Sequence, residues 1–166
     1  MAAEARTGGP GAPGRLDASD GFVLLYRDRY PSLVRLAVLL VDSTEQAEEL
    51  VQEAFARAYL RWDKLDHPEA YVRRVLVNAS RDVLRRRRIE RRLSLRPTPP
   101  DDTVHDRDYL DDALAALPGR ERIALVLTYY EGLDEAATAE LMGCPRGTVK
   151  SLLHRGIARL RGQIRR

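Results

Sequence analysis

Cysteine, tryptophan and histidine are scarce in this sequence of 166 residues, and their scarcity excludes several kinds of site. The one cysteine, Cys144, allows no disulfide within the chain. No group of Cys and His has the spacing of a metal site, so we expect no bound metal. We interpret Cys144 as a small, buried apolar residue rather than a redox group.

Long apolar runs and catalytic patterns are also missing. No uninterrupted apolar run approaches the length of a membrane span. The N-terminus has no apolar segment of the kind that a secretory signal needs, and we therefore expect a cytoplasmic protein. There is no glycine-rich phosphate loop and no nucleophile–base pattern. We predict no enzymatic activity and no cofactor.

Charge, by contrast, is abundant and strongly segregated along the chain. Residues 71–96 carry ten Arg against two acids, and residues 145–166 carry seven basic residues and no acid. Residues 42–53 carry five acids and no base, and residues 101–112 carry six Asp against one Arg. Two separate basic patches indicate two contacts with a polyanion. The acidic stretches either bind something other than DNA or are simply solvated.

The segment 133–160 predicts two short helices joined by a tight turn. Asp134 can cap the first helix, and Gly143 reaches the positive φ that a sharp turn needs. Ala139, Gly143 and Val149 keep the offsets of a DNA-binding helix-turn-helix, which requires a small residue, a glycine and a branched apolar residue in that order. The alternative is a helical hairpin with a solvated basic face.

The N-terminal half predicts a tail followed by helices. Residues 1–20 are rich in Ala, Gly and Pro and predict disorder. Apolar spacing over 20–41 predicts a helix that Pro31 kinks or divides in two. Residues 43–62 form the clearest amphipathic pattern, with capping candidates at 42–45. From composition alone, its acidic outer face is ordinary solvation.

A further helix is predicted to open at Pro68, where the missing N–H costs nothing. Arg74, Asn78, Arg81 and Arg85 are spaced so that they share one outward stripe. Arginines with an asparagine among them suit phosphates and a base edge.

Two aromatic residues lie at the start of this region. Trp62 and Tyr71 offer surface on which an unstacked base could lie, although both could instead belong to the core. For Trp62 we favour the core, and for His67 we favour a loop or capping position.

Residues 93–107, with three prolines and several acids, predict a flexible linker. Fully extended, fifteen residues reach about 50 Å, the length of about 15 base pairs. Residues 108–131 predict two more helices, separated at Pro118 and Gly119. The sequence therefore predicts an all-α protein of two small helical domains joined by a flexible linker.

With these segments placed, residues 21–161 resemble an extracytoplasmic-function sigma factor of the sigma-70 family. The resemblance is carried by three stretches in this order: AEELVQEAFARAYLRWDKL (47–65), HPEAYVRRVLVNASRDVLRRRR (67–88) and LPGRERIALVLTYYEGLDEAATAELMGCPRGTVKSLLHRGIARLR (117–161). It departs from the family at Ala136, Ala137 and Thr138, where acidic residues and isoleucine are common, and at Tyr71, where many members have Trp. Because the sequence ends soon after the sigma-4 stretch, we expect no extra C-terminal regulatory domain.

The resemblance implies a domain organisation and a set of partners. It implies a sigma-2 domain over 21–92, a linker over 93–107 and a sigma-4 domain over 108–166. The implied partners are core RNA polymerase, through its β′ clamp and β flap, and promoter DNA. Many relatives are held inactive by an anti-sigma factor, which is therefore a candidate partner here.

The resemblance also implies three sets of binding residues. The β′ clamp would bind the acidic helix, at Asp42, Glu45, Glu48, Glu49, Leu50, Gln52 and Glu53. The −10 element would be recognised and melted, with a flipped base near the 63–67 break, by Trp62, His67, Tyr71, Arg73, Arg74, Asn78, Arg81 and Arg85. The −35 element would be read in the major groove by Arg146, Gly147, Thr148, Lys150, Ser151, His154 and Arg155.

The competing interpretation is a free-standing helix-turn-helix regulator with an N-terminal sensor or dimerisation domain. An Arg-rich N-terminal half without the pattern of a ligand pocket argues against it. An enzyme has little support.

Overall fold

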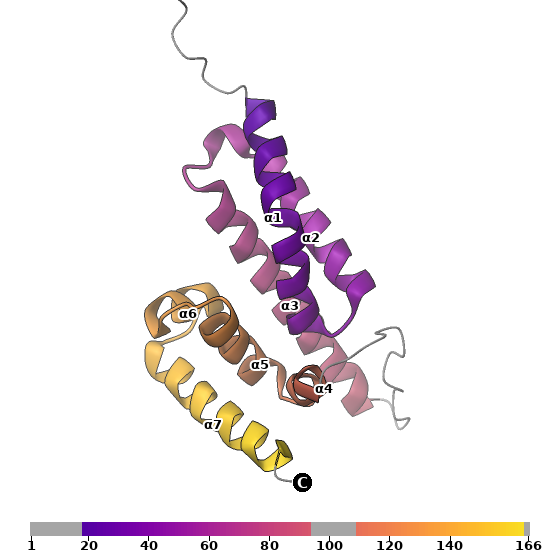
Figure 1. Cartoon of the computed structure of the whole chain (residues 1–166), viewed down its shortest axis with the longest axis vertical. Coiled ribbons are helices and arrows are strands. Elements are labelled where there is room, and N and C mark those ends of the chain that lie inside the picture. Colours follow the sequence, from indigo (N-terminus) through magenta and orange to yellow (C-terminus); the bar gives the residue numbers. More distant parts are fainter. Residues whose placement is uncertain (1–17, 94–108, 165–166) are drawn as a thin grey trace, which may run out of the picture.

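The computed structural model describes residues 18–93 and 109–164, with the side chains of 20–93 and 109–163. Within these residues the regular elements are helices and there is no strand, as the sequence predicts. Most of the predicted tail and most of the predicted linker lie outside the described residues, and residues 18–20, predicted to be disordered, belong to the first helix. The helices form two groups, α1 to α3 and α4 to α7, that lie against each other (Figure 1).

Helix α1 (Ala18–Val41) is a single helix with Pro31 inside it. Of the two outcomes predicted at Pro31, a kink or a division into two helices, the division is therefore wrong. The proline removes one backbone hydrogen bond and is itself exposed. Beyond it, the helix buries Leu33, Leu36 and Leu40 in the core, and this burial offsets the lost hydrogen bond.

Helix α2 (Thr44–Tyr59) follows the predicted pattern. Ser43 caps it, because its side chain accepts from the backbone N–H of Gln46 at 3.3 Å. The face predicted to be apolar is buried at Ala47, Leu50, Val51, Ala54, Phe55 and Ala58. A short 3₁₀ helix, η1 (Trp62–Lys64), then leads into the break before the next helix.

Helix α3 (Pro68–Leu93) begins at the predicted proline and runs for 26 residues. It packs against both α1 and α2. Its buried side includes Val72, Leu76, Val77 and Val83. The first three helices therefore enclose a core built from the heptad-like spacing of small and branched apolar residues.

The second group begins with α4 (Tyr109–Ala115) and α5 (Gly119–Leu125), which continues as the π-helical turn η2 (Val126–Tyr130). Then come α6 (Glu135–Met142) and the long α7 (Arg146–Ile164). Helix α7 packs mainly on α5 and α6.

The two groups share one continuous apolar core. Helix α3 contacts α5 and α6, and α1 contacts α4, α5 and η2. Arg122 of α5 is almost fully buried at this junction, where its guanidinium donates to the carbonyl oxygens of Leu40, at 3.2 Å, and of Ala115. The second group therefore packs directly against the first (Figure 1).

Candidate nucleic-acid interface

The helix-turn-helix geometry is built by two local interactions that the sequence predicts. The carboxylate of Asp134 accepts from the backbone N–H of Ala137 at 2.8 Å and caps α6. Gly143 ends that helix in the left-handed conformation, with φ of 60°, which glycine adopts without steric cost. Val149 and Leu152 then bury one side of α7.

The opposite side of α7 presents the residues predicted for the −35 element. Thr148 is half-buried and the others are exposed: Arg146, Gly147, Lys150, Ser151, His154 and Arg155. The hydroxyl of Ser151 donates to the carbonyl of Gly147 at 3.0 Å, within its own helix. The guanidinium of Arg155 forms an ion pair of 3.5 Å with buried Glu121, which also pairs with Arg159 at 3.0 Å. This face is thus a polar and basic surface, and the carboxylate of Glu121 holds two of the arginines of α7 in place.

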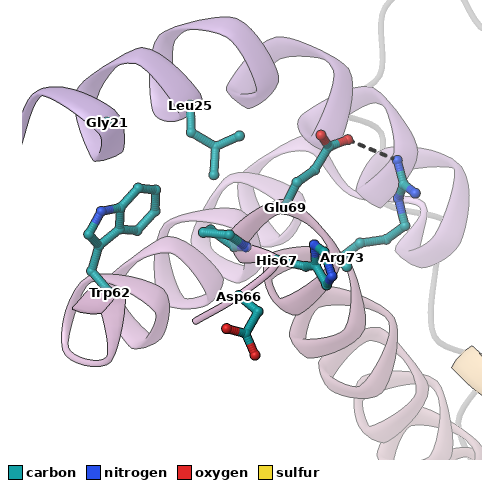
Figure 2. A pocket seen from close by; sticks show the side chains of 9 residues that line it. Gly21, Leu25, Trp62, Asp66, His67, Glu69 and Arg73 are labelled. Atoms are coloured by element: carbon teal, nitrogen blue, oxygen red, sulfur yellow. Dashed lines mark hydrogen bonds and ion pairs between the residues drawn. The ribbon is translucent and has the colours of Figure 1, made fainter. Parts of the chain in front are cut away.

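A second feature is a pocket of about 590 Å³ between the start of α1, η1 and the start of α3. Figure 2 shows Trp62 on one side of it, with Glu69 and Arg73 opposite. His67 is exposed at its edge, and Arg73 is held by Glu69 at 3.3 Å. The pocket thus combines an aromatic face with one guanidinium and several acceptors.

Trp62 is half-buried, so it contacts the core and also keeps part of its ring on the wall of the pocket. Its ring meets Phe22 edge-on, with centroids 5.3 Å apart, and it also lines the pocket. Tyr71 is half-buried against the core and does not line this pocket. The structure therefore brings Trp62, His67 and Arg73 together and leaves Tyr71 out.

The predicted stripe on α3 faces the second group of helices. Arg74 pairs with Glu140 of α6 at 2.9 Å, and Arg81 donates to the carbonyl of Met142 at 3.0 Å. Arg85 is exposed and lies 3.7 Å from Asp82 of its own helix, and Asn78 is half-buried. The stripe exists, but part of it is engaged within the molecule.

The acidic face of α2 is open to solvent. Glu45, Glu48, Glu49, Gln52 and Glu53 are exposed, and Asp42 is half-buried. Glu53 pairs with Arg57 one turn along the helix, at 2.6 Å. Leu50, which was grouped with these residues, is instead buried in the core, so it supports the face without forming its surface.

Family models match both groups of helices. The model described as Sigma-70 region 2 matches residues 25–89, and the model described as Sigma-70, region 4 matches residues 107–160. The chain is 37% identical over 146 residues to the RNA polymerase sigma-E factor of Streptomyces coelicolor, covering 83% of this chain and 82% of that protein. The chain belongs to the extracytoplasmic-function sigma factors of the sigma-70 family.

A second relative agrees with this membership. The ECF RNA polymerase sigma factor SigM of Mycobacterium tuberculosis is 33% identical over 154 residues, with 84% of this chain and 74% of that protein covered. The chain is therefore a subunit that directs RNA polymerase to promoters, and the hypothesis of a free-standing regulator is not favoured. Sigma factors as a family are non-enzymatic initiation factors.

Two solved structures share the fold. The sigma factor RpoE of Bartonella quintana, solved with the anti-sigma factor NepR, matches with a TM-score of 0.71 and 24% identity over 87% of this chain and 97% of that one. CnrH, solved with the cytosolic domain of CnrY, matches with a TM-score of 0.63 and 22% identity over 89% of this chain and 91% of that one. In the described part of this sigma factor, no helix is long and apolar enough to cross a bilayer.

Sequence reasoning missed the charged residues that join the two groups of helices, and it missed Glu121, which pairs with Arg155 and Arg159 within the second group. Glu121 and Arg122 are charged yet buried, and Glu131 and Glu140 pair with arginines of α3. The one available signal was the position of Glu121 and Arg122 immediately before the apolar run Ile123 to Leu127. Charged residues are mostly exposed, so these two would be expected at the surface. The neighbouring sequence does not indicate which distant residues they pair with.

Proposed function

We propose that this sigma factor reads two promoter elements with two separate surfaces, in domains that span 21–92 and 108–166. The exposed face of α7 reads the −35 element as duplex, and the pocket at Trp62 with the stripe on α3 recognises the melted −10 element. The observation that carries the proposal is the co-occurrence of a capped helix-turn-helix and an aromatic-lined pocket in one chain.

The −35 element is duplex DNA, and its bases are read from the major groove. Helix α7 begins after a tight turn, so its first turns can enter a groove while α6 crosses the backbone. Arg146, Lys150, His154 and Arg155 supply donors to phosphates and base edges, with Ser151 and Thr148 between them.

The −10 element has to be opened, which costs about 1–2 kcal/mol of stacking per base-pair step. An aromatic face that stacks on an extruded base returns about 1–3 kcal/mol. Trp62 offers such a face in the pocket, and Arg73 and His67 lie where they can bind the base edge or its phosphate. Arg74, Asn78, Arg81 and Arg85 continue the basic track along α3.

Core RNA polymerase supplies the catalytic activity in this proposal, and the sigma factor itself catalyses nothing. The exposed carboxylates of α2 dock on the β′ clamp, and the second domain meets the β flap. Because these partners are in the cytoplasm, so is the protein. The two solved relatives were captured with an anti-sigma factor or a cytosolic partner domain, which supports an anti-sigma factor as a partner here.

Run-off transcription tests the proposal. A promoter is first found by mapping transcript starts after forced expression, and the protein is then added to core polymerase on that template. Wild type should give a specific transcript and Lys150→Ala a reduced one, because the variant loses one phosphate contact and binds the promoter more weakly. The slope of log affinity against log salt concentration should fall in magnitude by about one. Arg161→Ala is the matched control, because Arg161 is an exposed basic residue of α7 outside the proposed groove face.

No transcript above the level of core polymerase alone would contradict the proposed function. Equal loss in the Lys150 and Arg161 variants would contradict the assignment of the groove face while leaving promoter-directed transcription intact.

A further inference from the structure

The arginines at the end of α3 belong to none of the three sets of binding residues described above. Arg88, Arg91 and Arg92 follow the stripe proposed for the −10 element and lie within the last two turns of the helix. All three line a cavity of about 600 Å³, which lies between the end of α3, the stretch from α4 to α5, and α7. We call it the arginine cavity.

Three further arginines line the arginine cavity from the second group of helices: Arg120, Arg122 and Arg155. Among the described residues of its wall there is one carboxylate, that of Glu121, which already pairs with Arg155 at 3.5 Å and with Arg159 at 3.0 Å. No ion pair within the described ranges involves any other arginine of this wall. A concave site with such an excess of one charge concentrates its field on a ligand of opposite charge.

Arg122 adds an unpaired hydrogen-bond donor. Two of its nitrogens donate to the carbonyl oxygens of Leu40 and Ala115, but its Nε is buried and has no acceptor among the described residues. Buried polar atoms nearly always have a hydrogen-bond partner in native proteins. An oxygen anion is the kind of ligand that an unpaired guanidinium donor selects.

The rest of the wall is largely apolar. Leu84, Leu117 and Leu152, which are buried in the core, contribute to it. A second cavity, of about 400 Å³, adjoins the first, since Leu84, Arg88 and Gly119 line both. Small-molecule sites commonly have this size and combine an apolar wall with a few charged groups.

We propose that the arginine cavity binds a small oligophosphate, such as the triphosphate of a nucleotide. Guanidinium groups bind phosphate oxygens through paired N–H donors, and a chain of phosphates carries enough negative charge to engage several arginines at once. The apolar wall suits the organic part of a nucleotide. A DNA duplex is too wide to enter a cavity of about 600 Å³ that three elements enclose.

Arg155 connects the arginine cavity with the surface proposed for the −35 element, because it belongs to both. While its guanidinium binds a phosphate of the ligand, it is not available to a phosphate of DNA. A bound oligophosphate should therefore weaken binding of the −35 duplex. This consequence rests on the proposed function, whereas the binding of the ligand does not.

Isothermal titration calorimetry of the full chain tests the site, in magnesium-free buffer near 0.1 M salt. Inorganic tripolyphosphate and ATP should each bind at one site per chain. AMP should bind at least about tenfold more weakly than ATP, because it lacks two of the phosphates that the arginines engage. The titrations thus separate recognition of the phosphates from recognition of the nucleoside.

A pair of double variants locates the site. Arg88→Gln/Arg120→Gln should bind tripolyphosphate at least about tenfold more weakly than wild type, because two charged donors are lost. Arg86→Gln/Arg161→Gln is the matched control, which removes the same charge at exposed arginines that line neither cavity. Its affinity should stay within about twofold of wild type, since distant exposed charges are largely screened by salt.

Two results of the titrations would refute the site. The first is the absence of saturable binding by both tripolyphosphate and ATP. The second is equal weakening in the two double variants, which would indicate attraction to the net charge alone. If the oligophosphates fail to bind and only Arg88→Gln/Arg120→Gln loses affinity for promoter DNA, these arginines serve DNA and the proposal falls.

Fluorescence anisotropy of a labelled −35 duplex separates the site from the proposed function. Saturating ATP should lower the affinity of wild type for the duplex by about threefold, and that of Arg88→Gln/Arg120→Gln by less at the same ATP concentration. Binding of ATP by a protein that does not bind the duplex at all would contradict the proposed function and leave the site intact. Equal duplex affinity with and without bound ATP would refute the competition for Arg155.

Discussion

Arg122 shows how one side chain can join two parts of a protein. Its guanidinium donates to the last turn of α1, at Leu40, and to the end of α4, at Ala115. Burial lowers the pKa of Arg122 to about 10, a shift that nearby Asp42 opposes and Arg87 and Arg91 reinforce. At neutral pH the group is still a cation, and its positive charge strengthens both hydrogen bonds.

Replacing Arg122 with methionine should lower the free energy of unfolding by about 2–3 kcal/mol, because two carbonyl oxygens lose their donor in a buried place. Urea unfolding followed by circular dichroism measures the change. Arg120→Met on the same helix is the control, since Arg120 is exposed. Equal midpoints for the two variants would contradict a structural role for the Arg122 hydrogen bonds.

At the scale of the element, two of the three glycines of α7, Gly156 and Gly162, have opposite surroundings. A Cβ added at Gly156 would lie 2.7 Å from Cδ1 and 3.2 Å from Cγ of Leu125, which is buried. A Cβ added at Gly162 would meet nothing within 4 Å. Gly156 therefore permits the close approach of α5 and α7, and Gly162 does not serve packing.

The same substitution should consequently act in opposite directions at the two positions. Gly162→Ala should stabilise by up to about 1 kcal/mol through helix propensity. Gly156→Ala gains the same propensity but forces the Leu125 side chain aside, at a cost of about 1–3 kcal/mol. The urea unfolding midpoints of the two variants measure the difference. Equal increases in the two midpoints would show that Leu125 of α5 moves aside at no cost in stability.

The elements themselves could be predicted from the sequence because their signals are local. Ser43, Asp134 and Gly143 act within three or four residues of their own position, and the apolar face of α2 follows a 3.6-residue period. The predicted division at Pro31 was wrong because the hydrogen bond that proline removes is a local loss, whereas the burial that offsets it depends on tertiary packing.

The seating of one domain on the other could not be predicted in this way. The pair of Arg74 with Glu140 joins residues 66 positions apart, and each partner alone is typical of a solvated helix face. The pocket at Trp62 could be predicted only in part. The sequence indicated the aromatic residue and the break after it, but not that Gly21 and Leu25 of α1 line the same pocket.

At the scale of the whole molecule, charge is divided by surface as well as by sequence. The exposed carboxylates of α2 form a face without a basic residue from 42 to 53, while α3 and α7 carry the cations. Opposite charges on separate faces let the molecule approach polymerase and DNA in defined orientations.

Charge reversal at Glu48 and Glu49 to lysine should therefore weaken co-purification with core polymerase, because both side chains are exposed on that face. The fold should be unaffected, since surface substitutions usually change stability by about 0.5 kcal/mol or less. Circular dichroism checks the fold. Normal recovery of core polymerase with the variant would remove α2 from the docking surface.

The ion pair between Arg74 and Glu140 has a consequence for anyone who would retarget this protein to a new promoter. If Arg74 binds DNA as well as Glu140, a substitution chosen for its base preference also removes a contact between α3 and α6. A library of Arg74 variants screened for transcript output would then mix two traits, the packing of α6 on α3 and the specificity for the promoter. Varying position 140 together with position 74 would let the two be tuned apart.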